Sequence, residues 1–242
     1  LVSDWSSDVC SSDLTIFDKG KDKLRKLGSI AEVKYGQKTG SNPFFLLDRS
    51  DQDYWEIEEE YLRSFVKSSR ECRSMRISQD QISLAVFSCA LGKEDLVGTN
   101  ALKYIEYGEN DDEWIDPKDG IAKPPYLNSS CAVRRLWYDA GVQSPPDFIW
   151  FKGFNERFLV VSNEDGAAVG DRLYAVSLNE DFAAYKSETL ICLNSTISHL
   201  FTELHGRVNL GEGALDIMTY EVAGIPVLLP NLISAIEMPI TG

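Results

Sequence analysis

The apolar residues of this 242-residue chain fall into short runs, and this pattern limits the folds that it can adopt. The longest runs, at residues 86–87, 158–161 and 225–229, have the length of β-strands. None approaches the roughly 18 consecutive apolar residues that a membrane-spanning helix requires. Because 43% of the residues are hydrophobic and 26% are charged, we expect a globular protein with a sizeable core and no membrane association.

Residues 1–14 (LVSDWSSDVCSSDL) differ from the rest of the chain. They are rich in Ser and Asp and lack the basic start and apolar stretch of a secretory signal. Residues 4–14 resemble the translation of a common sequencing-library adapter. We therefore interpret residues 1–14 as an artefact, and we expect Thr15 onward to be the C-terminal piece of a longer protein.

The remaining patterns predict strands and helices that do not alternate regularly. Residues 27–48 are typical of a strand, a long turn and a second strand, and further strands are expected at 82–89, 148–151, 158–161 and 172–176. Helical spacing occurs at 56–66 and at 98–108, where Thr99 suits the N-cap. After Ser187 the apolar spacing predicts one amphipathic helix of about five turns that Gly206 ends.

Irregular alternation argues against a doubly wound parallel sheet and favours an α+β fold. We expect a strand-rich body with inserted helices over residues 15–186. Over residues 187–242 we expect a long C-terminal amphipathic helix and a Gly-rich tail that pack on this body.

The cysteines and histidines outside the artefact are widely separated: Cys72, Cys89, Cys131, Cys192, His199 and His205. They form no C-x-x-C pair, so we expect no metal site. Without a secretory signal, buried thiols in a cytoplasmic protein are the expected state of the cysteines.

Basic residues concentrate in two parts of an acidic chain. Lys and Arg number 24 and Asp and Glu 38, and the resulting net charge of −14 does not itself predict a nucleic-acid partner. Residues 15–49, however, contain eight basic and four acidic residues, and residues 61–79 contain five basic residues and Glu71. Because salt screens charges beyond about 8 Å, such islands can meet a polyanion. A solvated surface is the alternative interpretation.

The stretch KYGQKTGSN at residues 34–42, here called the opening loop, combines glycines, lysines and amides. Its backbone N–H groups and the side chains of Lys34, Lys38, Thr39 and Ser41 suit phosphate. The amides of Gln37 and Asn42 suit the edge of adenine. The order of residues differs from a Walker loop, and an ordinary turn is the alternative.

A second glycine-rich stretch, GRVNLGEGALD at residues 206–216, places Arg207 and Asn209 among glycines. The end of a helix accounts for Gly206 but not for Gly211 and Gly213, which predict a tight turn or a close approach of another chain.

The residues for catalysis are missing from the sequence. The tetrad KPPY at residues 123–126 resembles the N-P-P-Y tetrad of amino-methyltransferases, but lysine has no hydrogen-bond acceptor for the target amine. The chain also lacks an F-x-G-x-G cofactor turn and a Ser/His/Asp set. We therefore expect no catalytic residue and no cofactor site in this chain.

Several blocks together carry a family resemblance: LGSIAEVKYGQKTGSNPFFLLD, EEEYLRSFVKSSR, RRLWYDAG, DRLYAV and LNSTISHLFTELHGRVNLGEGALDIMTYEVAGIPV. In this order they resemble the C-terminal target-recognition region of TaqI-like adenine-specific DNA methyltransferases. The resemblance extends over nearly all of residues 27–230.

This resemblance implies that a missing N-terminal domain binds S-adenosylmethionine and methylates adenine N6 in a bacterial restriction-modification system. The present region would clamp double-stranded DNA and read its sequence while the target base is flipped. The residues that match the family's pattern are expected to lie at the DNA: Gly36, Lys38, Thr39, Gly40, Asn42, Arg135, Trp137, Tyr138, Gly211, Glu212 and Gly213. With Lys34, Gln37, Arg207 and Asn209, we expect these residues to share one concave surface.

Two other functions remain open on the sequence. The chain is alternatively a stand-alone specificity module, which the gene upstream of Thr15 would distinguish. It is alternatively a sugar- or protein-binding domain with Trp114, Trp137, Tyr138 and Trp150 as an aromatic platform.

Overall fold

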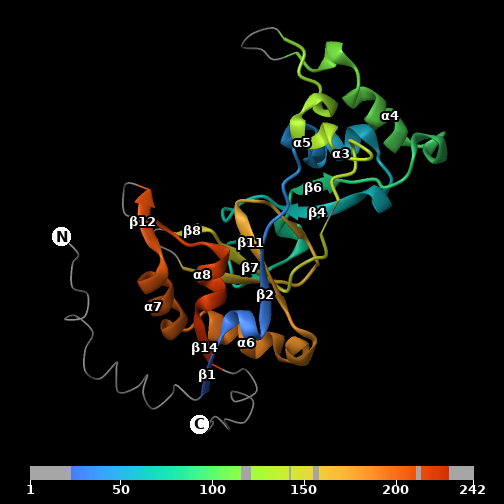
Figure 1. Ribbon diagram of the computed structural model, residues 1–242. Helices are drawn as coiled ribbons and strands as arrows, with labels where there is room; N and C mark the ends of the chain where they lie inside the picture. The colour runs from blue at the N-terminus through green and yellow to red at the C-terminus, as the bar shows by residue number, and fades with distance from the viewer. Residues whose placement is uncertain (1–22, 116–120, 142, 155–157, 211–213, 229–242) are drawn as a thin grey trace. The chain divides into compact units, whose positions relative to one another are not determined.

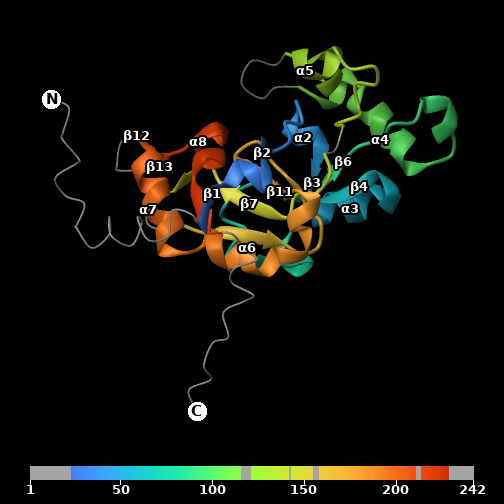
Figure 2. The same cartoon turned by 60° about the horizontal axis from the view of Figure 1, so that its bottom comes forward.

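The computed structural model describes residues 23–115, 121–141, 143–154, 158–210 and 214–228, which form a mixed α/β fold of small sheets and short helices (Figures 1 and 2). The helices are α2 (Asn42–Phe45), α3 (Arg49–Trp55), α4 (Asn100–Gly108), α5 (Ser129–Ala132), α6 (Lys186–Leu193), α7 (Thr196–His205) and α8 (Thr219–Gly224). The predicted artefact at residues 1–14 and the residues Gly211, Glu212 and Gly213 lie outside the described residues.

The strands are short, as the apolar runs predict. They are β1 (Leu24–Lys26), β2 (Ala31–Tyr35), β3 (Leu46–Leu47), β4 (Leu62–Val66), β5 (Arg76–Ile77), β6 (Leu84–Phe87), β7 (Phe148–Phe151), β8 (Gly153–Phe154), β9 (Val160–Asn163), β10 (Ala168–Val169), β11 (Leu173–Leu178), β12 (Arg207–Leu210), β13 (Ala214–Asp216) and β14 (Pro226–Leu228).

The chain forms two compact units. Unit 1 contains Leu1–Val33, Gly153–Phe158 and Leu178–Gly242, and unit 2 contains Lys34–Lys152 and Leu159–Ser177. The expected division of the sequence at residue 187 stays a prediction.

Unit 2 contains a four-stranded sheet in the order β10-β4-β6-β3 and most of a five-stranded sheet in the order β2-β11-β7-β9-β5. In the first sheet β4 is antiparallel to β6 and parallel to β10. In the second, β7 is antiparallel to both of its neighbours, and its four residues are all buried. A strand covered on both faces reads as a continuous apolar run, which explains why FIWF was recognisable in the sequence.

Helix α4 shows how local signals position the aromatic core of unit 2. As predicted, Thr99 caps the helix, and its side chain accepts a hydrogen bond from the backbone N–H of Leu102. The carboxylate of Glu58 accepts two more, from Asn100 N at 2.8 Å and Ala101 N at 3.0 Å. The buried face of α4 then places Tyr104 against Phe44, with ring centroids 4.6 Å apart. Both views place α3 and α4 close to β4 and β6.

Unit 1 combines two small sheets with the last three helices. Strand β1 pairs antiparallel with β14, and β13 lies between β12 and β8. Helices α6 and α7 pack on β14, and α8 packs on the turn at Leu27–Ser29. The core residues include Leu27, Leu193, Val222 and Ile225, each fully buried.

The single long helix expected after Ser187 is wrong, because two shorter helices, α6 and α7, replace it. Ser195 separates the two helices, because its side chain accepts a hydrogen bond from Ser198 N and caps α7. The hydroxyl of Ser198 in turn donates to the buried carbonyl of Cys192 at 2.7 Å. Serine competes with the helix backbone in this way, while the apolar spacing continues across the break.

Two shorter elements also differ from the expectation. Residues 56–66, expected as a helix, form a 3-10 turn at Glu59–Tyr61 followed by β4. Pairing with β6 and burial of Phe65 and Val66 outweigh the helical spacing of the sequence. Residues 44–47, expected as a strand, divide between α2 and β3, because Pro43 lies in the first turn of α2.

The cysteines at positions 72, 89, 131 and 192 are buried and are not joined in disulfides. Burial raises the pKa of the Cys192 thiol to about 11, so this thiol stays protonated near neutral pH. In the described part of the chain, no cluster of His, Cys, Asp and Glu has the arrangement of a metal site. Among these same residues no helix is long and apolar enough to cross a membrane.

Candidate nucleic-acid interface

The backbone of the opening loop is fixed by the turn between β10 and β11. Gly36 N donates a hydrogen bond to Leu173 O at 3.0 Å, and Gln37 N donates to Val169 O at 2.6 Å. A Cβ atom on Gly36 would lie 2.1 Å from the carbonyl oxygen of Gly170. Glycine is therefore required at position 36 for close packing of two backbones, not for contact with a ligand.

The Gln37 side chain belongs to the fold in this structure. It is 4% exposed, its Nε2 donates to Ala140 O at 2.6 Å, and its Oε1 accepts from Gln143 N at 3.2 Å. Because both ends of the amide are already bonded to backbone groups, this side chain is not placed to read an adenine edge. Its role is to hold the segment after Ala140 against the opening loop.

The next residues form a compact turn. The buried Thr39 hydroxyl donates to Asn42 Oδ1 at 2.6 Å, and Gly40 has a φ of +91°, which favours glycine. Arg134, which the sequence did not single out, donates from Nη2 to Thr39 O at 2.6 Å and lies over the ring of Phe45. Lys34, Lys38 and Asn42 are exposed, so the loop presents cations from a rigid base.

An open cavity of about 520 Å³ lies beside this turn. Residues 38–43 line it together with Glu113, Trp114, Ile115, Lys123, Asn128 and Asp171. Lysines and acids are mixed in the lining, so the cavity is not a simple anion site. Residues 113–128 and Asp171 are distant in sequence from the loop, and no motif of the sequence joined them to it.

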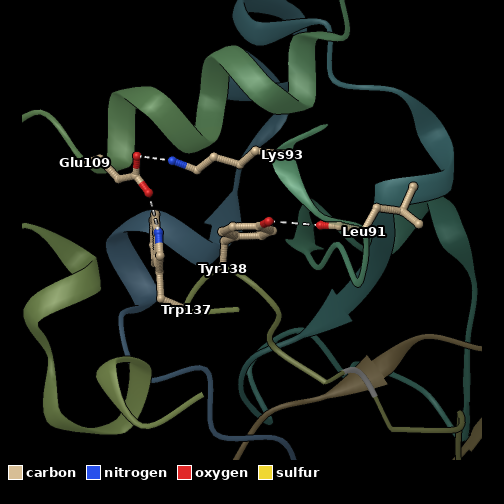
Figure 3. A network of polar contacts seen from close by, with 5 residues as sticks. All are labelled: Leu91, Lys93, Glu109, Trp137 and Tyr138. Atoms are coloured by element: carbon tan, nitrogen blue, oxygen red, sulfur yellow. Dashed lines mark hydrogen bonds and ion pairs between the residues drawn. The ribbon is translucent and has the colours of Figure 1, made fainter. Parts of the chain in front are cut away.

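The segment RLWY at residues 135–138 contributes mainly to the core (Figure 3). Trp137 Nε1 donates to Glu109 Oε1 at 2.8 Å, and Lys93 binds the other carboxylate oxygen of Glu109. Tyr138, 2% exposed, donates from its hydroxyl to Leu91 O at 2.9 Å. The buried ring of Tyr138 is therefore not accessible to a base, whereas the partly buried Trp137 also lines a cavity with Arg135.

Arg135 is the exposed residue of this segment. Its Nη2 donates to Ala90 O at 3.4 Å, and the side chain lines a cavity of about 450 Å³ with residues 90–95. The four-residue aromatic platform is not formed, because Trp150 is 1% exposed and Tyr138 is 2% exposed.

Arg207 lies in unit 1 and is bound to an acid. It donates to Glu221 Oε1 at 2.5 Å and to the Tyr220 hydroxyl, and Glu221 also accepts from Met218 N at 2.8 Å. Asn209 lies in β12, and Gly211 and Gly213 fall outside the described residues. Because Lys34 and Arg135 belong to unit 2, a surface shared with Arg207 stays a prediction.

The expectation that this chain holds no S-adenosylmethionine site stays a prediction. Among the described residues, every buried side-chain nitrogen and oxygen has a hydrogen-bond partner. The sequence also lacks the cofactor turn. We therefore derive no chemical step through this cofactor in the present chain.

A solved structure, that of BpuSI, shares this fold. The type IIG restriction endonuclease BpuSI matches with a TM-score of 0.62 at 12% identity, over 86% of this chain and 24% of that chain. The type IIL restriction-modification enzyme MmeI, solved in complex with DNA, matches with a TM-score of 0.49 at 13% identity, over 81% of this chain and 25% of that chain. This chain thus spans about a quarter of each enzyme's length.

No curated protein gives a significant match. A family model described as the C-terminal domain of the type II methyltransferase M.Eco57I matches residues 14–239. The match takes in nearly the whole chain and confirms the resemblance to a methyltransferase C-terminal region. The protein therefore belongs to the family of M.Eco57I-type type II methyltransferase C-terminal domains.

Proposed function

We propose that this chain is the DNA target-recognition domain of an adenine-N6 DNA methyltransferase of a restriction-modification system. The observation that carries the proposal is the family match over residues 14–239. The exposed Lys34 and Lys38, presented by a braced turn beside an open cavity, support it physically. Cations on a rigid support are suited to binding the phosphates of a duplex.

In this proposal the chain binds and orients DNA, and a separate domain performs methyl transfer with S-adenosylmethionine. Lys34, Lys38 and Arg135 contact phosphates and fix the register of the duplex. Asn42 is the exposed amide of the opening loop; because its Oδ1 already accepts a hydrogen bond from Thr39, its Nδ2 group is the candidate donor to a base edge. Because the resemblance implies a bacterial restriction-modification system, the parent enzyme would act on DNA in the cytoplasm.

Binding of the full chain to labelled duplex DNA at low salt tests the proposal. We expect a mobility shift that weakens steeply as salt rises, since phosphate contacts release counterions. Lys34→Ala and Lys38→Ala are each expected to weaken it. A chain that is folded by circular dichroism and yet does not shift the duplex would overturn the proposal.

The methyltransferase part of the proposal has its own test. Sequencing of the gene upstream of Thr15 is expected to show an F-x-G-x-G turn followed by an N-P-P-Y tetrad. An upstream region without these motifs would indicate a stand-alone specificity subunit, and it would leave the DNA-binding proposal standing.

A further inference from the structure

Three segments of unit 2 run parallel and end side by side. Strand β10 is parallel to β4, with Val169 opposite Val66, and Gln37 forms a parallel bridge with Gly170. Gly170 N donates to Val66 O at 2.9 Å, and a Cβ on Gly170 would lie 3.4 Å from the Cα of Lys67. The opening loop, the turn after β10 and the loop after β4 therefore begin side by side at one edge of unit 2.

Cations follow each of the three segment ends. Lys38 follows the bridge residue Gln37, Arg172 lies in the turn after β10, and Lys67 and Arg70 lie in the loop after β4. All four side chains are exposed. Arg172 is more than a hundred residues from the other three in the sequence, so the arrangement is visible only in the fold.

Two acids are adjacent to these cations in sequence, Glu71 beside Arg70 and Asp171 beside Arg172. The carboxylate of Glu71 accepts hydrogen bonds from Ser68 N at 3.0 Å and from Lys67 N at 3.2 Å, which braces the loop. Its charge is thus directed at backbone N–H groups. Asp171 is exposed beside Arg172 and lines the cavity of the opening loop. Cations therefore outnumber exposed acids at these three segment ends.

We propose that Lys67, Arg70 and Arg172 form a phosphate-binding edge that grips the backbone of duplex DNA beside the opening loop. The inference rests on the proposed function and adds contacts that the family motif does not include. Lysine and arginine at phosphates position a duplex without reading its sequence. The edge therefore contributes to the affinity and register of DNA binding, and the bases are read by residues of the opening loop.

The test compares two double variants with equal loss of charge. Arg70→Gln with Arg172→Gln removes two cations of the edge. Arg49→Gln with Lys103→Gln removes two exposed cations on α3 and α4 as the control. Dissociation constants for labelled duplexes of two unrelated sequences are measured over a salt series, with thermal melting to verify the fold.

We expect the edge variant to bind both duplexes equally weakly. Its slope of log affinity against log salt should fall by about 2, because each phosphate contact contributes about 0.9. The control variant should keep the slope of the original chain. If the edge variant melts early, Lys67→Gln and Arg172→Gln singly should each lower the slope by about 0.9.

Two results overturn the inference. An edge variant with the slope of the control means that these cations do not contact phosphates, and binding by the original chain would still uphold the proposed function. Unequal losses on the two duplexes mean base readout instead of backbone contact. Failure of the original chain to bind either duplex would remove the proposed function itself.

Discussion

The opening loop and the 135–138 segment differ in composition, but each combines inward-facing side chains with an exposed cation. In the opening loop the polar side chains Gln37 and Thr39 turn inward to brace the turn, and Lys38 points outward. In the 135–138 segment Trp137 and Tyr138 turn inward to complete the aromatic core, and Arg135 is exposed.

The comparison teaches that a family motif mixes two sets of residues. One set builds the support, and the other meets the ligand. In both segments the cation is the outward residue, because burying an unpaired charge costs far more than burying a bonded amide or indole. The exposure of a side chain and its existing hydrogen bonds therefore distinguish supporting residues from ligand-binding residues better than the residue type does.

The largest expected effect is on the support formed by Trp137. Trp137→Ala should lower the free energy of unfolding by about 3 kcal/mol, since it removes a ring packed on Phe44 and the bond to Glu109. Urea unfolding measures the loss, and Tyr54→Ala, at a residue 79% exposed, is the control. Stable Trp137→Ala protein that had lost DNA binding would reverse the assignment of this residue.

The next effect concerns the close backbone approach in the opening loop. Gly36→Ala should destabilise unit 2 by about 2 kcal/mol, because its Cβ would collide with the Gly170 carbonyl. Gly224→Ala is the control, since a Cβ there meets nothing within 4 Å. Thermal melting distinguishes them, and equal melting temperatures would mean that the two backbones separate easily.

A smaller effect on stability depends on pH and concerns Glu58, which accepts hydrogen bonds at the start of α4. Burial alone would raise the pKa of the Glu58 carboxyl, but its own backbone N–H and those of Asn100 and Ala101 hold the pKa below its ordinary value of 4.5. The ionised Glu58 carboxylate therefore stabilises the folded state above pH 4.5, and this stabilisation is lost as pH falls through the lower pKa of the folded state.

Glu58→Gln should cost about 1 kcal/mol at neutral pH, the size of a helix-cap loss. Urea unfolding from neutral to acid pH should show the difference from the original chain shrinking below pH 4.5. A difference that stays constant with pH would mean that the charge of Glu58 does not stabilise α4.

The smallest effect on stability belongs to the outward cations. Lys38→Gln and Arg135→Gln should each change the free energy of unfolding by less than about 0.5 kcal/mol. Each should lower the salt slope of duplex binding by about 0.9. Fluorescence anisotropy over a salt series measures this, and a change for Lys38 alone would restrict the interface to the opening loop.

Local signals in the sequence predicted the elements that local physics decides. Thr99 and the spacing after it gave α4, and the continuous apolar run gave β7. Helical spacing failed at residues 56–66, because pairing of β4 with β6 depends on a partner about twenty residues away. The prediction of one continuous helix across Ser195 failed for the opposite reason, because one capping side chain outweighs a regular apolar pattern.

The candidate site was predictable only in part. Glycine, lysine and amide types marked the opening loop, but not which side chains face inward. The bonds from Gln37 to Ala140 and from Arg134 to Thr39 span about a hundred residues, so no spacing in the sequence indicates them. The alignment of Lys67 and Arg172 is likewise set by the register of β10 on β4.

The interleaving of the two units determines how the protein can be recombined. Unit 2 consists of Lys34–Lys152 and Leu159–Ser177, so the polypeptide passes between the units at four points. A hybrid made with a single crossover would join halves of different parents within at least one unit. Exchange of unit 2 between relatives requires four matched junctions, two of which interrupt β2 and β11.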